Sequence, residues 1–183
     1  MRKPIRLQQF LEGPWPDRAA VLADLDGCLL SGDTVLPDVP ELFARCADRL
    51  WIVSNNSSDT AQTLSARLAG LGLTLPAERI VLAGEMTLRA LQAGRPGARV
   101  ALYASAPLQV LARELGLRSD RDTPETVVLA RDTALSFSDL ARIAEFAHAG
   151  VPVTLANPDT SHPGADGTPR PETGALWAAV AAG

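Results

Sequence analysis

The chain has 183 residues, enough for one buried core or for a small core with an inserted subdomain. Its composition, with 46% hydrophobic and 21% charged residues, is that of a globular protein, and the net charge of −4 argues against a basic nucleic-acid-binding surface. Apolar runs fall short of the ~20 residues that span a membrane, and residues 1–18 lack a signal-peptide core, so we expect a cytoplasmic protein.

Short apolar segments alternate with segments of helical periodicity along most of the chain. The predicted strands are Val21–Leu25, Leu50–Ser54, Ile80–Ala83, Val100–Tyr103, Thr126–Ala130 and Val153–Ala156. Hydrophobic residues three and four positions apart predict helices at Thr60–Leu71, Glu85–Ala93, Leu108–Leu115 and Phe137–His148. This alternation predicts an α/β fold with a largely parallel sheet and right-handed crossovers. Residues 157–173, with four prolines and no apolar periodicity, are predicted to form a long ordered loop.

Two carboxylates follow the first predicted strand, in the sequence Asp24-Leu25-Asp26-Gly27. Ligands of open parallel sheets bind beyond the carboxyl ends of the strands, where these acids are expected. A carboxylate can attack phosphorus, while a second acid protonates the leaving oxygen and later activates water. Mg²⁺ prefers one or two carboxylates together with phosphate oxygens and water. An Asp-Gly turn is the simple alternative, but Asp24 is expected inside the apolar run, where an unpaired charge is costly.

The second predicted strand also ends in polar residues, Ser54-Asn55-Asn56-Ser57-Ser58. Ser54 at the strand end, with neighbouring backbone N–H groups, can hold a phosphoryl oxygen, and the N-terminus of the following helix favours an anion. Capping of that helix explains Ser57 and Ser58, but it leaves Ser54 and Asn55 without a role. Together with Asp24, this pattern favours a phosphate-binding site.

These motifs, in this order and spacing, resemble those of the haloacid-dehalogenase-like (HAD) hydrolases, in the branch of NagD and p-nitrophenylphosphatase. The first two polar segments are similar to the first two motifs of the family. Leu129-Ala130-Arg131-Asp132 resembles a G-L-D-R-D segment of the branch. Ala156-Asn157-Pro158-Asp159 followed by Pro171-Glu172-Thr173-Gly174-Ala175 resembles its A-T-N-P-D and P-G-T-G-A signature, from which Leu155 and Glu172 depart.

The resemblance implies a Mg²⁺-dependent phosphatase that hydrolyses a small organic phosphate monoester through an aspartyl-phosphate. Asp24 would be the nucleophile and Asp26 the general acid and base. Mg²⁺ would bind the Asp24 carboxylate and the Asp26 backbone carbonyl. Ser54 would bind the phosphoryl group, with Asn55 close by.

The same resemblance implies a domain organisation. Residues 1–94 would form a Rossmann-like parallel core, residues 95–171 an inserted α/β cap, and residues 172–183 a helix that returns to the core. The cap loop would cover the site, with His162 as the candidate for contacting the substrate; an exposed loop histidine is the equal alternative. Cap-mediated homodimers would fit the branch.

Two further family motifs are not visible: a lysine, usually in G-K-P, and acids, usually in G-D-x-x-x-T-D. The chain ends at Gly183, where the lysine motif would be expected, and Lys3 precedes the first strand. The core is therefore expected to be incomplete at its C-terminus, with Val21–Leu25 as an exposed apolar edge. We expect a fragment of a longer enzyme, while a decayed or regulatory remnant and a chain completed by a partner stay open. Each missing charged contact would lower the rate ~10²–10³-fold, so we expect weak turnover or none.

Two other functions are compatible with the sequence. The missing lysine and acids favour a catalytically inactive module that binds a phosphorylated ligand without hydrolysing it. A third hypothesis makes Cys28 the nucleophile and His162 its base, although a small residue after Gly27 explains the cysteine more simply.

Overall fold

The structure is a computed structural model that describes residues 6–13, 19–164 and 168–182. The chain forms two compact units. Unit 1 comprises residues 1–54 and 61–81, and unit 2 comprises residues 55–60 and 82–183. In the part of the chain that the structure describes, no helix is both long and apolar enough to cross a membrane.

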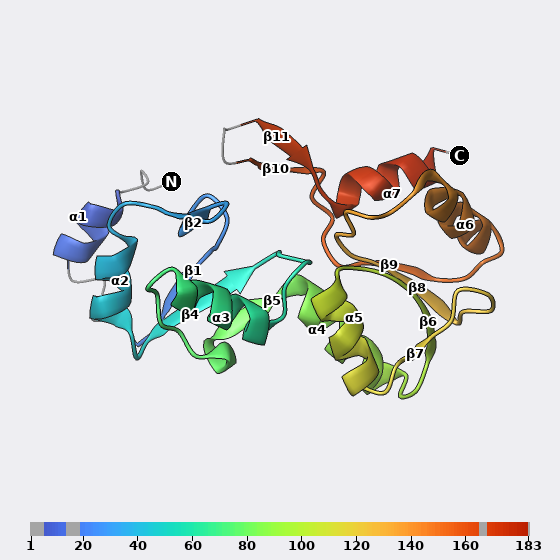
Figure 1. Cartoon of the computed structure of the whole chain (residues 1–183), viewed down its shortest axis with the longest axis horizontal. Coiled ribbons are helices and arrows are strands. Elements are labelled where there is room, and N and C mark those ends of the chain that lie inside the picture. Colours follow the sequence, from blue (N-terminus) through green and yellow to red (C-terminus); the bar gives the residue numbers. More distant parts are fainter. Residues whose placement is uncertain (1–5, 14–18, 165–167, 183) are drawn as a thin grey trace. The chain divides into compact units, whose positions relative to one another are not determined.

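Unit 1 is built on a three-stranded sheet in the order β1-β4-β5, in which β1 runs parallel to β4 (Figure 1). The strands are β1 (Val21–Ala23), β4 (Leu50–Ser54) and β5 (Ile80–Leu82), and β2 (Leu30–Ser31) pairs with β3 (Thr34–Val35) in a separate antiparallel hairpin. The helices are α1 (Leu7–Glu12), α2 (Val39–Cys46), α3 (Ala61–Gly70) and a 3₁₀ turn, η2 (Ala77–Arg79). The strands are therefore joined in sequence order through α2 and α3.

One face of this sheet is buried and the other is open. Ala23, Leu50 and Ile52 point to the buried face, and Leu50 and Ile52 are fully enclosed. Leu22, opposite Trp51 in the register, points to the other face and is 70% exposed. Successive right-handed crossovers that proceed in one direction across a sheet place their helices on the same side. The order β1-β4-β5 therefore accounts for a single covered face.

Unit 2 contains a four-stranded sheet in the order β7-β6-β8-β9, with every neighbouring pair parallel. Its strands are β6 (Arg99–Tyr103), β7 (Arg118–Ser119), β8 (Thr126–Leu129) and β9 (Val153–Leu155), and a hairpin pairs β10 (Ser161–Pro163) with β11 (Pro169–Pro171). The helices are α4 (Ala83–Gly94), α5 (Ala106–Glu114), α6 (Phe137–His148) and α7 (Thr173–Ala181).

Both faces of the unit 2 sheet are covered, because the direction in which successive strands are added reverses after β7. Alternate residues of β6 separate into two hydrophobic clusters. Val100 and Leu102 pack with residues of α4 and α5, whereas Ala101 and Tyr103 pack with residues of α6 and α7. Figure 1 shows α5 on one side of the β6–β9 sheet and α6 with α7 on the other.

The predicted α/β fold with a parallel sheet is confirmed. Each of the six predicted strands and four predicted helices lies within a few residues of an observed element. The prediction of a long loop at residues 157–173 is wrong, because it contains the β10–β11 hairpin, in which His162 lies opposite Arg170. Among the residues that the structure describes, β1 pairs with β4 alone, which agrees with the predicted edge position of the first strand.

Leu22→Lys tests whether the side chain of Leu22 faces solvent on the open face of the unit 1 sheet. Because the side chain of Leu22 lies largely in solvent, we expect the free energy of unfolding to change by less than about 1 kcal/mol. A lysine on an edge strand should also reduce self-association, measured by sedimentation velocity. Leu50→Lys is the matched control, and it should cost about 4 kcal/mol or more because Leu50 is fully buried. Equal losses in denaturant unfolding would contradict an open face.

Candidate functional site

The first and second motifs lie at the same edge of the unit 1 sheet. The register pairs Ala23 with Ile52, so Asp24 follows the end of β1 beside the last residues of β4. Ser54 ends β4 and is buried, with 6% of its surface exposed. The parallel register thus brings the carboxyl ends of both strands together, as the sequence predicts.

The residues after β1 form a tight turn around one carbonyl group. The backbone oxygen of Leu25 accepts hydrogen bonds from the N–H groups of Leu29 (2.9 Å) and Leu30 (3.0 Å). Gly27 adopts a φ of 74°, which a residue without a Cβ allows, and its N–H donates to Leu30 O at 2.7 Å. The turn hypothesis and the site hypothesis are therefore compatible, since the turn presents the two acids at the sheet edge.

The carboxylate of Asp24 is accessible to solvent, contrary to the prediction that it lies within the apolar run. The strand ends at Ala23, so the side chain emerges where backbone pairing has stopped. Its Oδ1 accepts a hydrogen bond from the Leu25 N–H at 2.8 Å. Its second oxygen bonds to no residue that the structure describes, and so one carboxylate oxygen is available to a ligand.

Cys28 lies close enough to Asp24 for the carboxylate to influence its ionisation. Partial burial raises the pKa of the Cys28 thiol, and the negative charge of Asp24 raises it further. A hydrogen bond from the Asp24 backbone N–H acts in the opposite direction and is outweighed. A raised pKa leaves less thiolate at neutral pH, and the thiolate is the nucleophile. The hypothesis of a cysteine nucleophile is therefore disfavoured.

Asp24→Asn is expected to make Cys28 more reactive. Removing the carboxylate charge lowers the pKa of the thiol, so more thiolate is present at any given pH below it. Alkylation by iodoacetamide at about pH 8 should become faster, as followed by mass spectrometry. Asp33→Asn serves as the control with the same charge change, and the fully buried Cys46 should not react while the protein is folded. An unchanged rate in Asp24→Asn would show that the carboxylate does not act on the thiol.

Residues 55–60 belong to unit 2, where several hydrogen bonds hold them. The Asn56 carbonyl accepts from the Gly84 N–H (3.1 Å) at the start of α4. Ser57 Oγ accepts from the Arg131 N–H (3.2 Å) and lies 3.2 Å from Thr173 Oγ1. Ser57 therefore connects segments of unit 2. It does not cap the following helix, which is the role that the sequence predicts for it.

Asn55 contacts the loop that follows β9. Its Nδ2 donates a hydrogen bond to a carboxylate oxygen of Asp159. Asn157, which is buried, accepts the Asp159 N–H at 2.9 Å, and the Gly174 N–H donates to the Asp159 carbonyl at 2.8 Å. The sequence signature around residues 156–175 thus corresponds to a hydrogen-bonded loop that positions the Asp159 carboxylate against Asn55.

Gly174→Ala should disrupt this loop. A Cβ at Gly174 would lie 2.1 Å from the Pro158 carbonyl oxygen and 2.7 Å from that of Asp159, so the backbone would have to move. We expect a loss of about 2 kcal/mol or more in the free energy of unfolding, measured with denaturant. Gly94→Ala is the control, because no atom lies within 4 Å of its added Cβ and helix residues favour alanine. Equal stability of the two variants would contradict close packing at Gly174.

His162 belongs to a charged cluster on the β10–β11 hairpin and its surroundings. Its Nδ1 lies 2.7 Å from Glu172 Oε1, and Arg131 Nε lies 3.5 Å from the same oxygen. The Glu172 side chain is only 12% exposed, so this carboxylate needs cationic or hydrogen-bonding neighbours. Sequence reasoning assigned no role to Arg131 or Glu172. The departure of Glu172 from the family signature was the available signal, because an acid there faces a histidine and an arginine.

Two cavities adjoin this cluster, and Arg131, Asp132 and Thr133 line both. One, of about 440 Å³, also contacts Ser58, Ser105 and Gln109. The other, of about 410 Å³, also contacts Arg170 and Glu172. Unit 2 therefore contains two cavities with polar and charged walls, and their volumes are in the range of small-molecule sites. Asp24, Asp26 and Ser54 belong to unit 1, whereas Asn55 and His162 belong to unit 2.

A family model for haloacid dehalogenase-like hydrolases matches residues 21–118. The chain belongs to this family. Mouse chronophin is 35% identical over 177 residues, an alignment that covers 87% of this chain and 60% of chronophin.

Solved structures of HAD-family phosphatases share the fold. A 4-nitrophenylphosphatase from Thermotoga maritima superposes with a TM-score of 0.81 at 26% identity, covering 91% of this chain and 65% of that one. A glycerol phosphate phosphatase from Mycobacterium tuberculosis, in complex with magnesium, superposes with a TM-score of 0.80 at 29% identity. The superposition covers 91% of this chain and 52% of that one. The chain thus spans about half to two thirds of the length of these relatives.

The donor set of this HAD chain fits Mg²⁺ in part. Asp24 supplies an accessible carboxylate, and Asp26 lies two residues further along the same turn. Mg²⁺ usually takes one or two carboxylates together with phosphate oxygens and water, which matches these acids. Among residues 6–13, 19–164 and 168–182, no group of three or more His, Cys, Asp or Glu side chains could enclose a metal. Asp24 and Asp26 are therefore the described residues that could take part in holding a Mg²⁺ ion.

Proposed function

We propose that this chain carries the nucleophile and the substrate-contacting unit of a HAD phosphatase that hydrolyses a small organic phosphate monoester. The observation that supports it most directly is the accessible Asp24 carboxylate after the end of β1, at the same edge of the sheet at which the parallel strand β4 ends in Ser54. Family membership and the phosphatase relatives give the reaction class.

In the proposed reaction, a carboxylate oxygen of Asp24 attacks phosphorus and the ester P–O bond breaks. Asp26 donates a proton to the leaving alkoxide, which departs as an alcohol. Water then attacks the aspartyl-phosphate while Asp26 accepts its proton, and phosphate leaves as Asp24 is regenerated. Ser54 and Asn55 hold the phosphoryl oxygens. Bound Mg²⁺, held by Asp24 and the Asp26 carbonyl, would neutralise phosphate charge.

Within unit 2, His162 is the residue proposed to contact the leaving group, as the resemblance to the family implies. His162 and Arg131 supply hydrogen-bond donors, and Glu172 fixes their orientation through its contacts of 2.7 and 3.5 Å. Such a polar wall suits a compact leaving group with hydroxyl groups. The name of the Mycobacterium tuberculosis relative, a glycerol phosphate phosphatase, is consistent with this substrate class.

The chain is further proposed to be part of a longer enzyme. The alignment with mouse chronophin covers 87% of this chain but only 60% of the length of chronophin. The open face and edge strand of the unit 1 sheet support the same proposal, because parallel sheets are normally covered on both faces. A rival function, binding of a phosphate ester without hydrolysis, is favoured by the lack of a third acid near Asp24 among the described residues.

Asp24→Asn decides between these functions. With p-nitrophenyl phosphate and Mg²⁺, we expect any turnover by the chain to be weak and to fall by about 10³-fold or more in the variant, because the nucleophile is lost. Asp33→Asn, the same charge change at an exposed turn, should leave the rate unchanged. Equal rates in wild type and Asp24→Asn would refute the phosphatase mechanism. Calorimetric binding of glycerol 3-phosphate without release of phosphate would establish the rival.

A further inference from the structure

A cavity of about 250 Å³ lies in unit 2 between α5 and the edge of the sheet formed by β6 and β7. Its floor is apolar and consists of Val100, Leu102, Ala112 and Leu117. Its rim carries three arginines, Arg113, Arg118 and Arg121, together with Gln109 and Ser119, and no acidic residue lines it. None of these residues has a role in the proposed phosphatase reaction. We call it the α5–β7 cavity.

The cavity exists because β7 is too short to cover β6. The two strands pair at Arg99 with Arg118 and at Val100 with Ser119 only. The Asp120 N–H still donates to the Val100 carbonyl (3.0 Å), and then the chain leaves the sheet. The remaining edge of β6 is closed by a side chain, since the Arg121 guanidinium donates to the Leu102 carbonyl at 3.2 Å.

Arg121 is held in a fixed position on the rim. Besides the Leu102 carbonyl, its guanidinium contacts Asp139 Oδ1 at 3.2 Å and lies 4.4 Å from the centre of the Tyr103 ring. Hydrogen bonds from Ser136 hold the pKa of Asp139 low, with a further contribution from Arg121, so the acid stays ionised and compensates this arginine. An arginine restrained on three sides loses little freedom when it binds an anion.

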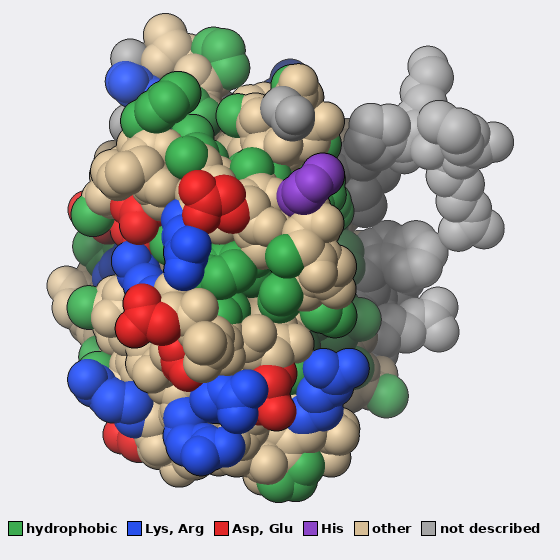
Figure 2. All heavy atoms as spheres, turned by 90° about the vertical axis from the view of Figure 1, so that its right-hand side faces the viewer, with side chains coloured by type: hydrophobic (Ala, Val, Ile, Leu, Met, Phe, Trp, Pro, Cys, Tyr) green, Lys and Arg blue, Asp and Glu red, His purple; other side chains and the backbone are tan. Residues whose placement is uncertain are grey.

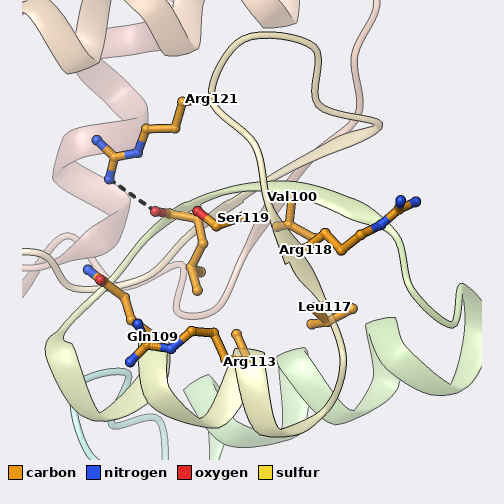
Figure 3. A pocket seen from close by; sticks show the side chains of 9 residues that line it. Val100, Gln109, Arg113, Leu117, Arg118, Ser119 and Arg121 are labelled. Carbon is orange, nitrogen blue, oxygen red and sulfur yellow. Dashed lines mark hydrogen bonds between the residues drawn. The ribbon is translucent and has the colours of Figure 1, made fainter.

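Arg113 is the uncompensated charge. Its guanidinium forms no ion pair or hydrogen bond with any residue in the described part of the chain, and the residue lies one helical turn after Gln109 on α5. Figure 3 shows the ends of Gln109 and Arg113 next to each other, with Arg121 on the other side of the cavity. Arg118 points away in the same view, and its Nε donates to the Gly97 carbonyl at 2.8 Å.

We propose that the α5–β7 cavity binds the phosphate group of a small molecule between Arg113 and Arg121. The Ser119 hydroxyl and the second N–H of the Gln109 amide, whose Nε2 also donates to the Ala104 carbonyl at 2.8 Å, would be further hydrogen-bond donors. Guanidinium groups match phosphate oxygens in geometry and in charge. The volume is slightly below the ~300 Å³ of ordinary small-molecule pockets, which suits inorganic phosphate or a compact ester. Figure 2 shows Lys and Arg side chains gathered at the lower edge of the face that it presents. In the α5–β7 cavity, Arg113 and Arg121 lie on the rim of a hollow with an apolar floor.

The test is a nuclear magnetic resonance titration of the full chain carrying Asp24→Asn, which prevents hydrolysis. Inorganic phosphate and glycerol 3-phosphate are added separately, and the side-chain Nε–H signals of Arg113 and Arg121 are followed, with sodium chloride as the ionic-strength control. We expect saturable shifts of both signals with at least one of the phosphates. Arg113→Gln should weaken binding about tenfold or more, since it removes a charge-assisted contact.

Arg142→Gln is the matched control, because Arg142 is an exposed arginine of α6 outside the cavity. It should change the affinity by less than about twofold, as expected for an exposed charge that does not line the cavity. Saturation by phosphate alone would assign the site to the free anion, and saturation by the ester alone to a phosphorylated metabolite. The proposal is overturned if neither saturates, if sodium chloride produces the same shifts, or if the two glutamine variants bind equally well. None of these outcomes depends on whether Asp24 is a nucleophile.

Discussion

The direction in which the chain proceeds across each sheet determines the rest of this structure. Parallel strands must be joined by crossovers, and these are almost always right-handed. In unit 1 the strands follow one another in sequence order, so both crossover helices lie on one face and Leu22 is left in solvent on the other. In unit 2 the direction reverses after β7, and the two hydrophobic clusters on opposite faces are the result.

The same constraint places chemistry at the ends of strands. In a parallel sheet all carboxyl ends lie at one edge, where backbone pairing stops and side chains can reach solvent. Asp24 and Ser54 lie at that edge in unit 1 because β1 and β4 are in register from Val21 to Ala23. In unit 2 the corresponding edge carries Ser105 after β6 and Arg131 after β8, and a cavity lies between them. Polar residues that interrupt an apolar run therefore identify these edges in both units.

The features that sequence reasoning predicted are those with a local cause. Apolar runs identify the strands β1, β4, β5, β6, β8 and β9, and Asp24 and Ser54 were found because they lie at strand ends. The β10–β11 hairpin was missed because its pairing joins residues such as His162 and Arg170, and neither strand has an apolar face. The roles of Ser57 and Glu172 were missed for a related reason. Their partners, Thr173 and Arg131, are brought near only by the fold.

Charge compensation around Glu172 illustrates how such long-range contacts depend on one another. Its carboxylate is mostly buried, and a buried charge without a partner is costly. His162 contacts it at the shorter distance but carries a charge only when protonated, whereas Arg131 is charged at every physiological pH. The permanent compensation of Glu172 therefore comes from Arg131, whose backbone N–H is also bound by Ser57. A single arginine thus connects the β10–β11 hairpin, the end of β8 and residues 55–60, so the placement of Asn55 and of His162 depends on the same side chain and peptide group.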